Sequence, residues 1–228
     1  MARPIDPHRD EFIAKILSQA TVLFAQQGYR NSTMEDISKR VKLKKSSLYH
    51  YFASKEHILF EAVWVNLNRS LEPLVALQNA GGPPRDRLRK AVAVLVQSMI
   101  DAPYVGSLFL NERSSLAPRR LKQCLELRKR HELAICSMVD QGVADCSFAD
   151  IETNIAVKLI FGALNWIPWW WRANGKYTPE QTAEVFADLL VDRFLGTSPE
   201  QGRTTDLVTG AAALQSAAQR SLTMPRSK

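Results

Sequence analysis

Apolar residues recur at every third or fourth position along most of the chain, which is the spacing of amphipathic helices. Gly28 follows the first such segment and Gly142 a later one, and glycine commonly closes a helix. No segment has the character of a β-strand. The pattern predicts an all-α fold, with helices over about 10–27, 33–41, 44–52, 54–77, 85–100, a short stretch after Pro103, 118–141, 150–172 and 179–195.

The two short helices within residues 33–55 form a distinct unit. Thr33 is followed three residues later by Asp36, so its oxygen can cap the first turn while the acid suits the positive end of the helix dipole. Helical spacing turns Leu48 and Phe52 of the second helix inward. Two short helices joined by a tight turn predict a helix-turn-helix.

The second of these helices has the chemistry of a DNA-reading element. Six basic residues and no acidic residue lie within positions 39–55. Free amides at a helix start suit a phosphate, lysines there add counterion release, and outward residues can reach base edges in the major groove. The candidates are Lys44, Lys45, Ser46, Tyr49 and His50. The alternative, a solvated basic face over core aromatics, leaves the exposed pair Tyr49 and His50 unexplained.

Composition also indicates an anionic partner. The 228 residues carry a net charge of +7 and have a pI of about 9.5, which suits nucleic acid or a membrane surface. The basic cluster at 39–55 favours nucleic acid. No apolar run reaches the length of about 18 residues that a membrane span needs, and acids and prolines stand where a signal peptide has an apolar core. We expect no membrane contact and a cytoplasmic, nucleoid-associated protein.

Candidate catalytic and metal-binding sets are not visible in the sequence. Cys124, Cys136 and Cys146 form no CxxC pair and, with four dispersed histidines, no zinc spacing. We expect them to be free, buried thiols. No Ser-His-Asp, Cys-His or paired-carboxylate set shares an apolar context, and His131 stands alone among charges. We therefore expect no catalytic residue, no metal, no cofactor and no enzyme activity.

The segments at 150–172 and 179–195 are apolar on nearly all sides. Such helices are usually fully buried, and two of them near the end of a chain predict a subunit interface and a homodimer. Pro168 should kink the first, and Thr178 should cap the second. The composition beyond Ser198 predicts a disordered tail.

The motif L-Y-H-Y-F-x-S-K at 48–55 is highly specific. Together with Phe24, Gly28, Thr33, Met34, Ile37, Leu43, Lys45 and Glu56, it makes residues 10–65 resemble the N-terminal domain of TetR-family transcriptional regulators. The resemblance implies that Thr33, Lys45, Tyr49 and Lys55 hold phosphates and that Ser46, Ser47 and His50 lie nearest the bases.

Three positions depart from that family pattern. Lys42 stands where the family usually has a turn glycine, and a lysine in the left-handed conformation costs roughly 1 kcal/mol. Lys44 replaces a small capping residue, and Ser46 replaces a frequent glycine. The extra lysines predict a stronger salt dependence of DNA binding than is usual.

The distal half resembles a branch of the family that responds to acyl-CoA thioesters. The matching residues are GALNW at 162–166, Trp170, Gly175, Thr178, Gly196, Asn111, Glu112, Arg113, Leu116, Pro118 and Arg128. A thioester needs an apolar channel, for which Phe109, Leu110, Trp166 and Trp170 are candidates beside Asn165, and cations for its phosphates, for which Arg113, Arg128 and Arg172 are candidates.

Simpler interpretations of the same residues stay open. Tryptophans at helical spacing belong to a core or a dimer interface as often as to a ligand pocket. Glu112 and Arg113 can form an internal ion pair, and Arg128 with Lys129 and Arg130 can form a solvated face.

The predicted protein is a dimeric repressor that a small-molecule effector, an acyl-CoA, releases from a double-stranded DNA operator. Alternatives are a regulator of this type with another hydrophobic ligand, an all-α enzyme acting on an acyl-CoA, and a membrane-surface protein. The predicted domains are a DNA-binding head (1–54), a ligand-binding and dimerisation body (55–197) and the tail (198–228).

Overall fold

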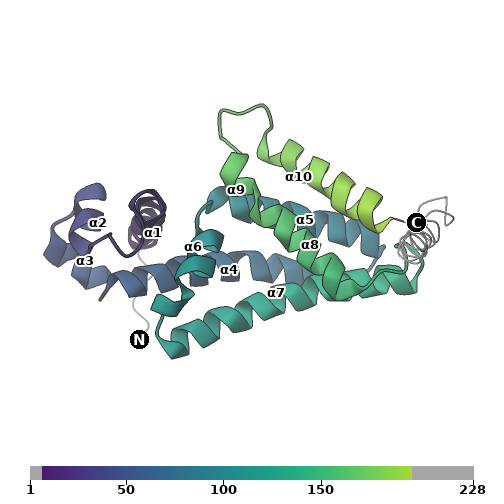
Figure 1. Ribbon diagram of the computed structural model, residues 1–228, viewed down its shortest axis with the longest axis horizontal. Coiled ribbons are helices and arrows are strands. Elements are labelled where there is room, and N and C mark those ends of the chain that lie inside the picture. The colour runs from purple at the N-terminus through teal and green to yellow at the C-terminus, as the bar shows by residue number, and fades with distance from the viewer. Residues whose placement is uncertain (1–6, 197–228) are drawn as a thin grey trace, which may run out of the picture.

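The computed structural model describes residues 7–196, and its regular structure is helical (Figure 1). Within this range the only β pairing is an isolated bridge between Phe148 and Gly196. The predicted all-α fold is confirmed, and the tail at 198–228 lies outside the described residues. The elements are α1 (Pro7–Gln27), α2 (Met34–Arg40), α3 (Lys45–Tyr51), α4 (Lys55–Asn79), α5 (Pro84–Asp101), α6 (Val105–Glu112), η1 (Arg113–Ser115), α7 (Pro118–Ala144), α8 (Thr153–Asn165), α9 (Ile167–Trp170), α10 (Pro179–Ala187) and η2 (Asp188–Leu195).

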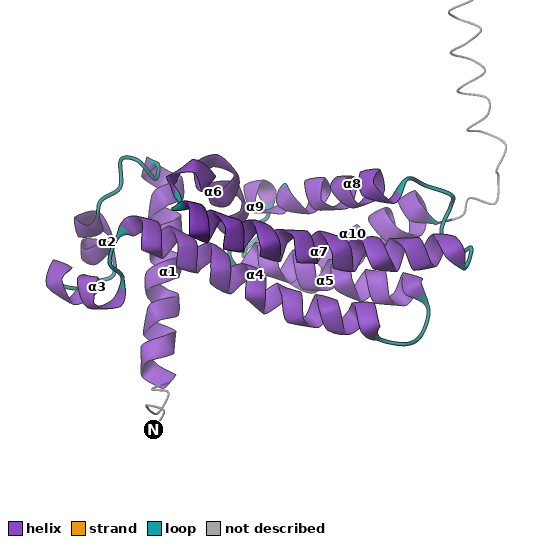
Figure 2. Cartoon of the chain, turned by 90° about the horizontal axis from the view of Figure 1, so that it is seen from below, coloured by secondary structure: helices purple, strands orange, loops and turns teal. Residues whose placement is uncertain are grey.

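Helices α1 to α3 form a small head at one end of the molecule, and α4 runs from this head into the body (Figures 1 and 2). The core of the head is continuous with α6 and the start of α7, because Phe109 and Cys124 belong to the same buried cluster as Phe24 and Leu48. A second cluster fills the body between α5, α7, α8 and α10. A shift of α4 or α6 therefore changes the packing of the head.

The predicted helix boundaries are largely those observed. Thr33 and Thr178 each make the reciprocal hydrogen bonds of a capping box, and Ser54 Oγ accepts a bond from the amide of His57 at 3.1 Å. Gly28 has a φ of +87°, the left-handed conformation expected after a helix. Helix α4 continues through Pro73 to Asn79, slightly beyond its predicted end.

The prediction that Gly142 ends its helix is wrong, since α7 continues to Ala144. The glycine is needed for packing instead. A Cβ atom at position 142 would lie 2.1 Å from Cδ2 of Phe148, whose amide donates a 2.8 Å hydrogen bond to the Gly142 carbonyl. The left-handed turn after the helix falls on Cys146, with a φ of 62°.

Replacing Gly142 by alanine should destabilise the protein by about 1–3 kcal/mol, because the Phe148 ring must leave a well-packed position. Urea unfolding measures this loss. Gly81→Ala is the matched control, since a Cβ there meets nothing within 4 Å. Equal stability of the two variants would contradict the packing role of Gly142.

The structure also corrects two expectations about burial. Cys124 is buried, but Cys136 is half-buried and Cys146 is exposed, so the thiols are free without all being buried. The apolar segment 150–172 breaks at Trp166 into α8 and α9, and one face of it is exposed.

Helix α10 continues as the π-helical η2. Ion pairs from Arg85 and Arg89 to Asp192 hold η2 against α5.

No single helix in residues 7–196 is long and apolar enough to cross a membrane. Only α5 together with the following α6–η1 segment passes that test, and the pair is bent by 79°.

Candidate DNA-binding surface and ligand cleft

Helix α3 presents the face that its helical spacing predicts. Leu48 and Phe52 are buried in the head, whereas Tyr49 is 47% exposed. Lys44, Lys45, Ser46 and His50 are also exposed, and Ser47 is half-buried. These side chains form a continuous outward surface on a short helix, free to meet a groove.

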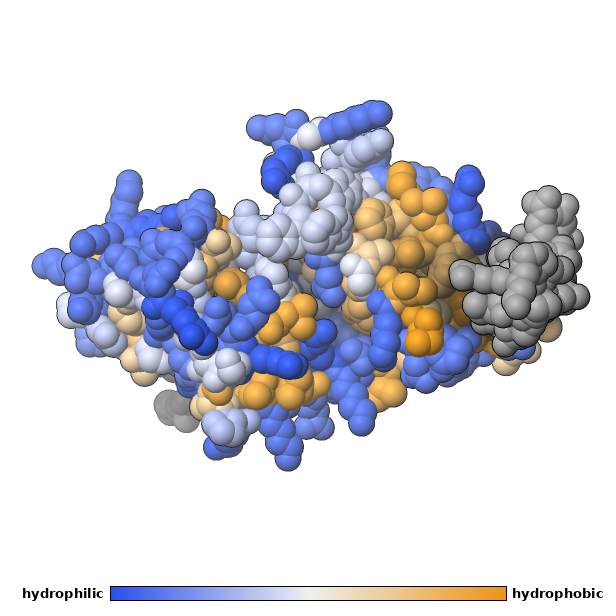
Figure 3. All heavy atoms as spheres, in the orientation of Figure 1, coloured by the Kyte–Doolittle hydropathy of each residue, from blue (hydrophilic) through white to orange (hydrophobic). Residues whose placement is uncertain are grey.

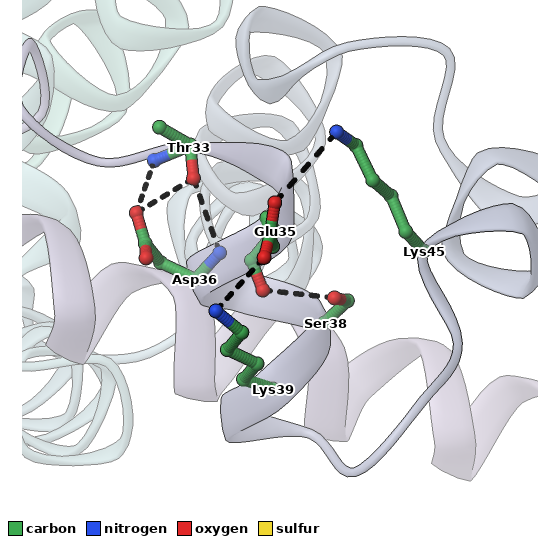
Figure 4. Close-up of polar contacts among 6 residues, drawn as sticks. All are labelled: Thr33, Glu35, Asp36, Ser38, Lys39 and Lys45. Carbon is green, nitrogen blue, oxygen red and sulfur yellow. Dashed lines mark hydrogen bonds and ion pairs between the residues drawn. The ribbon is translucent and has the colours of Figure 1, made fainter.

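An acidic residue from α2 stands beside this surface (Figure 4). Glu35 lies 2.8 Å from the ammonium of Lys39 and 4.0 Å from that of Lys45. The hydrogen bond from Lys39, with the charges of Lys39 and Lys45, lowers the pKa of the Glu35 carboxyl. Glu35 was not a predicted site residue, although its spacing of four from Lys39 is a recognisable ion-pair signal. Glu35 therefore pairs closely with Lys39 and only loosely with Lys45, so the ammonium of Lys45 can still bind a phosphate.

Thr33 acts as a cap in this structure (Figure 4). Its hydroxyl donates to Asp36 Oδ2 at 2.7 Å and accepts from the Asp36 amide at 3.1 Å, and its own amide donates to the same carboxylate at 2.9 Å. These bonds lower the pKa of Asp36. The donors that the predicted phosphate contact of Thr33 would use are therefore already engaged.

Lys55 also has a role that differs from the predicted one. Its ammonium donates to the carbonyls of Tyr29, Arg30 and Ser32 at 2.8, 3.0 and 2.9 Å. It lies 4.6 Å from the centre of the Tyr29 ring. Because an ammonium has three protons, Lys55 has no donor left for a phosphate and instead fastens the α1–α2 loop to the start of α4.

Replacing Lys55 by methionine should therefore cost about 1–3 kcal/mol of stability, because three carbonyls lose their donor. Thermal unfolding measures this loss. The slope of log affinity for DNA against log salt should stay unchanged. A variant of unaltered stability with a smaller salt slope would show that Lys55 does contact phosphate.

Lys42 has a φ of 59°, as predicted from its place in a glycine position. The side chain is exposed and extends the basic surface of the head.

A cleft in the body, partly open to solvent, lies between α4, α5, α6, α7 and α8. Three predicted ligand residues line it: Phe109, Arg128 and Asn165. Glu112, Arg113, Trp166 and Trp170 do not. About half of the lining residues have apolar side chains, including Leu67, Leu95, Met99 and Phe161.

Arg128 lines this cleft, and its guanidinium lies 5.4 Å from the centre of the Phe109 ring. Burial lowers the pKa of Arg128, and the charge of Arg113 acts in the same direction while Glu132 opposes them. No carboxylate among residues 7–196 forms a salt bridge with it. A half-buried cation of this kind suits an anionic ligand. The neighbouring Lys129 and Arg130 are exposed, as a solvated face requires.

Glu112 and Arg113 form no ion pair with each other in the described structure. The Glu112 carboxylate accepts a long hydrogen bond of 3.5 Å from Ser115, and Arg113 is exposed. Neither lines the cleft.

Trp166 and Trp170 belong to an exposed surface. Trp166 is 63% exposed, and the centre of its ring lies 5.8 Å from that of Trp169. Trp170 stacks on Phe186. Apolar side chains gather over α8 and α10 on this side of the molecule (Figure 3). We call the surface formed by Ile155, Leu159, Trp166, Trp169, Trp170, Val185, Leu189 and Phe194 the α8–α10 face.

The cleft also contains residues that the sequence did not nominate. Asn66, Ser70, Ser98 and His131 are polar, almost fully buried, and line its wall. Ser70 and His131 are 61 residues apart in the chain. Neither residue has a polar partner near it in the sequence that would mark a site, and only the fold brings the two together.

The chain is similar to known proteins over most of its length. The family model for bacterial regulatory proteins of the tetR family matches residues 16–62, and that for the tetracyclin repressor-like C-terminal domain matches residues 81–194. The chain is 28% identical over 118 residues to YuxN, an HTH-type transcriptional regulator of Bacillus subtilis; the match spans 52% of the chain and 40% of YuxN. It is 26% identical over 183 residues to the HTH-type transcriptional repressor KstR2 of Rhodococcus jostii, covering 78% of the chain and 88% of KstR2.

Similarity of fold extends to the solved structure of AibR in complex with isovaleryl coenzyme A and operator DNA. The TM-score is 0.67 at 20% identity, covering 79% of this chain and 98% of AibR.

Proposed function

The chain belongs to the tetR family of bacterial regulatory proteins, and we propose that it is a homodimeric repressor that an acyl-CoA thioester releases from its operator. The observation that carries the DNA-binding part is the exposed, basic face of α3 over a buried Leu48 and Phe52. In this role Lys44, Lys45 and Tyr49 hold phosphates, and Ser46, Ser47 and His50 face the bases. A protein that binds an operator works at the chromosome, so we propose a cytoplasmic location.

The dimer is proposed from the α8–α10 face. Large apolar side chains that are half exposed in one chain are stabilised when a second copy covers them. The same surface on both copies forms a closed, two-fold interface. Two heads held in this way would read half-sites about 34–36 Å apart.

The effector class is proposed from the cleft. Its apolar side chains suit an acyl chain, and the half-buried Arg128 in its lining suits a phosphate of the CoA moiety. The AibR complex named above contains isovaleryl coenzyme A together with operator DNA, which makes this chemistry compatible with the fold.

Coupling between cleft and head would act through α4. Val63, Asn66, Leu67 and Ser70 of α4 line the cleft, and the start of the same helix is held by Lys55. Glu56 of α4 pairs with Arg120 of α7 and accepts a 3.1 Å bond from the Ala117 amide. A ligand that binds better when α4 is displaced shifts the protein toward a state whose heads no longer fit the operator.

Fluorescence anisotropy with DNA from upstream of the protein's own gene tests this function. The wild-type protein should bind that DNA in preference to a shuffled sequence, and acyl-CoAs should release it while free CoA and free fatty acids should not. If only a different hydrophobic compound releases the DNA, that compound's class replaces acyl-CoA thioesters as the proposed effector. Equal binding to both DNAs would overturn the regulator itself.

A further inference from the structure

We propose that Asn66, Ser70, Ser98 and His131, here called the polar wall, form a subsite of the cleft for a neutral oxygen, a ketone or hydroxyl, on the hydrophobic part of the effector. The inference rests on the proposed ligand-responsive function and narrows its effector class. An acyl group bearing such an oxygen would be preferred over a saturated hydrocarbon chain.

Hydrogen bonds organise the polar wall from three helices. Ser70 of α4 lies 2.9 Å from His131 Nε2 of α7, and Ser98 Oγ of α5 donates to Asn66 Oδ1 at 3.3 Å. All four side chains are at most 9% exposed and line the same cleft. Polar groups of this kind in an otherwise apolar wall cost stability unless they have partners.

The direction of the bonds follows from His131. Its Nδ1 lies 2.8 Å from the carbonyl of Leu127, which can only accept, so Nδ1 carries the proton. Nε2 therefore accepts from the Ser70 hydroxyl, which also lies 3.2 and 3.3 Å from the carbonyl oxygens of Asn66 and Leu67. Burial lowers the pKa of His131, and the charges of Arg128 and Arg130 act in the same direction, which keeps the ring neutral.

One donor group of the polar wall remains unused. The Asn66 amide nitrogen has no acceptor among residues 7–196, while the amide oxygen is held by Ser98. The Ser70 and Ser98 oxygens each retain a lone pair, since their protons are already donated. A free amide donor beside hydroxyl acceptors suits a ketone or hydroxyl oxygen.

The polar wall itself carries no charge, because the histidine is neutral. The cation in the lining of the cleft is Arg128, one helical turn before His131 on α7. Arg128, Glu132 and Asn165 are partly or fully exposed, whereas the polar wall is buried. Apolar side chains such as Leu95, Phe109 and Phe161 lie in the same cleft. The cleft thus offers a cation, apolar side chains and a buried, neutral polar wall to one ligand.

Matched pairs of thioesters test the subsite on the full-length protein. 3-(4-Oxocyclohexyl)propanoyl-CoA and 3-cyclohexylpropanoyl-CoA have the same skeleton and differ by one oxygen. Isothermal titration calorimetry should give at least tenfold tighter binding of the oxo compound to the wild type. In Asn66→Leu the ratio should fall to about one, because the leucine removes the free donor at similar volume. Arg128→Met should weaken both compounds together and keep the ratio.

Equal binding of the two thioesters to the wild type would overturn the subsite and leave the acyl-CoA proposal standing. If neither thioester binds or releases DNA, the acyl-CoA proposal fails, and 4-pentylcyclohexanone and pentylcyclohexane are then compared by thermal shift. A larger shift with the ketone supports the subsite, and equal shifts overturn it. Asn66→Ala, which also removes the amide donor, replaces Asn66→Leu if that variant does not fold.

Discussion

Replacing Lys44 and Lys45 together by methionine should reduce the slope of log operator affinity against log salt by about 3 to 4, since each phosphate contact contributes about 0.9 and a dimer carries four of these lysines. Both side chains are exposed, and Lys44 makes no side-chain cap bond. The free energy of unfolding should therefore change by no more than about 0.5 kcal/mol. Affinity for operator and for random DNA should fall in parallel, because phosphate contacts carry no sequence information.

Anisotropy titrations over a series of salt concentrations measure this slope. Lys122→Met with Lys129→Met is the matched control, because it removes the same charge from exposed positions of α7. This control should keep the slope of the wild type. An equal loss of slope in both double variants would mean that overall charge, and not the face of α3, attracts DNA.

The contrast among the lysines of the head shows what a sequence can predict there. Helical spacing is enough to turn Leu48 inward and Lys45 outward, and a family pattern is enough to place Lys42 in the left-handed conformation. The engagement of Lys55 with three carbonyls depends on a loop more than 20 residues earlier in the chain. Residue type and spacing cannot distinguish a lysine that awaits a phosphate from one whose protons are already used.

The same limit applies to the body. His131 stands alone in its sequence context, yet α4 brings Ser70 to 2.9 Å from its ring. Arg128 and Phe109, both predicted from the sequence as ligand residues, line the same cleft, and their binding role stays a prediction. Trp166 was a candidate for the cleft on equal grounds, but the break between α8 and α9 turns it to the surface.

A helix that is apolar on all sides need not have every side buried by its own chain. The pattern at 150–172 predicted full burial, but Ile155 and Leu159 are about half exposed, at 55% and 50%. The hydrophobic pattern reports how much apolar surface must be covered and does not identify the partner that covers it. For this chain the uncovered part is the α8–α10 face.

Replacing Leu159 by glutamate should convert the proposed dimer to monomers, because a charge would be buried against its own symmetry copy. Operator affinity should then fall by about 10²–10⁴, the gain that joining two binding modules provides. Light scattering after size-exclusion chromatography measures the first effect, and anisotropy measures the second. Leu125→Glu on α7 is the matched control, since Leu125 is similarly exposed at 44% and lies outside the α8–α10 face.

The control should remain dimeric and bind the operator as the wild type does. A Leu159→Glu protein that is still dimeric would place the interface elsewhere. DNA with a single half-site separates the two causes of lost affinity, because only one head binds it in either protein. If the monomer binds this half-site as well as the wild type does, α3 is intact, and the loss on the full operator comes from the missing second head.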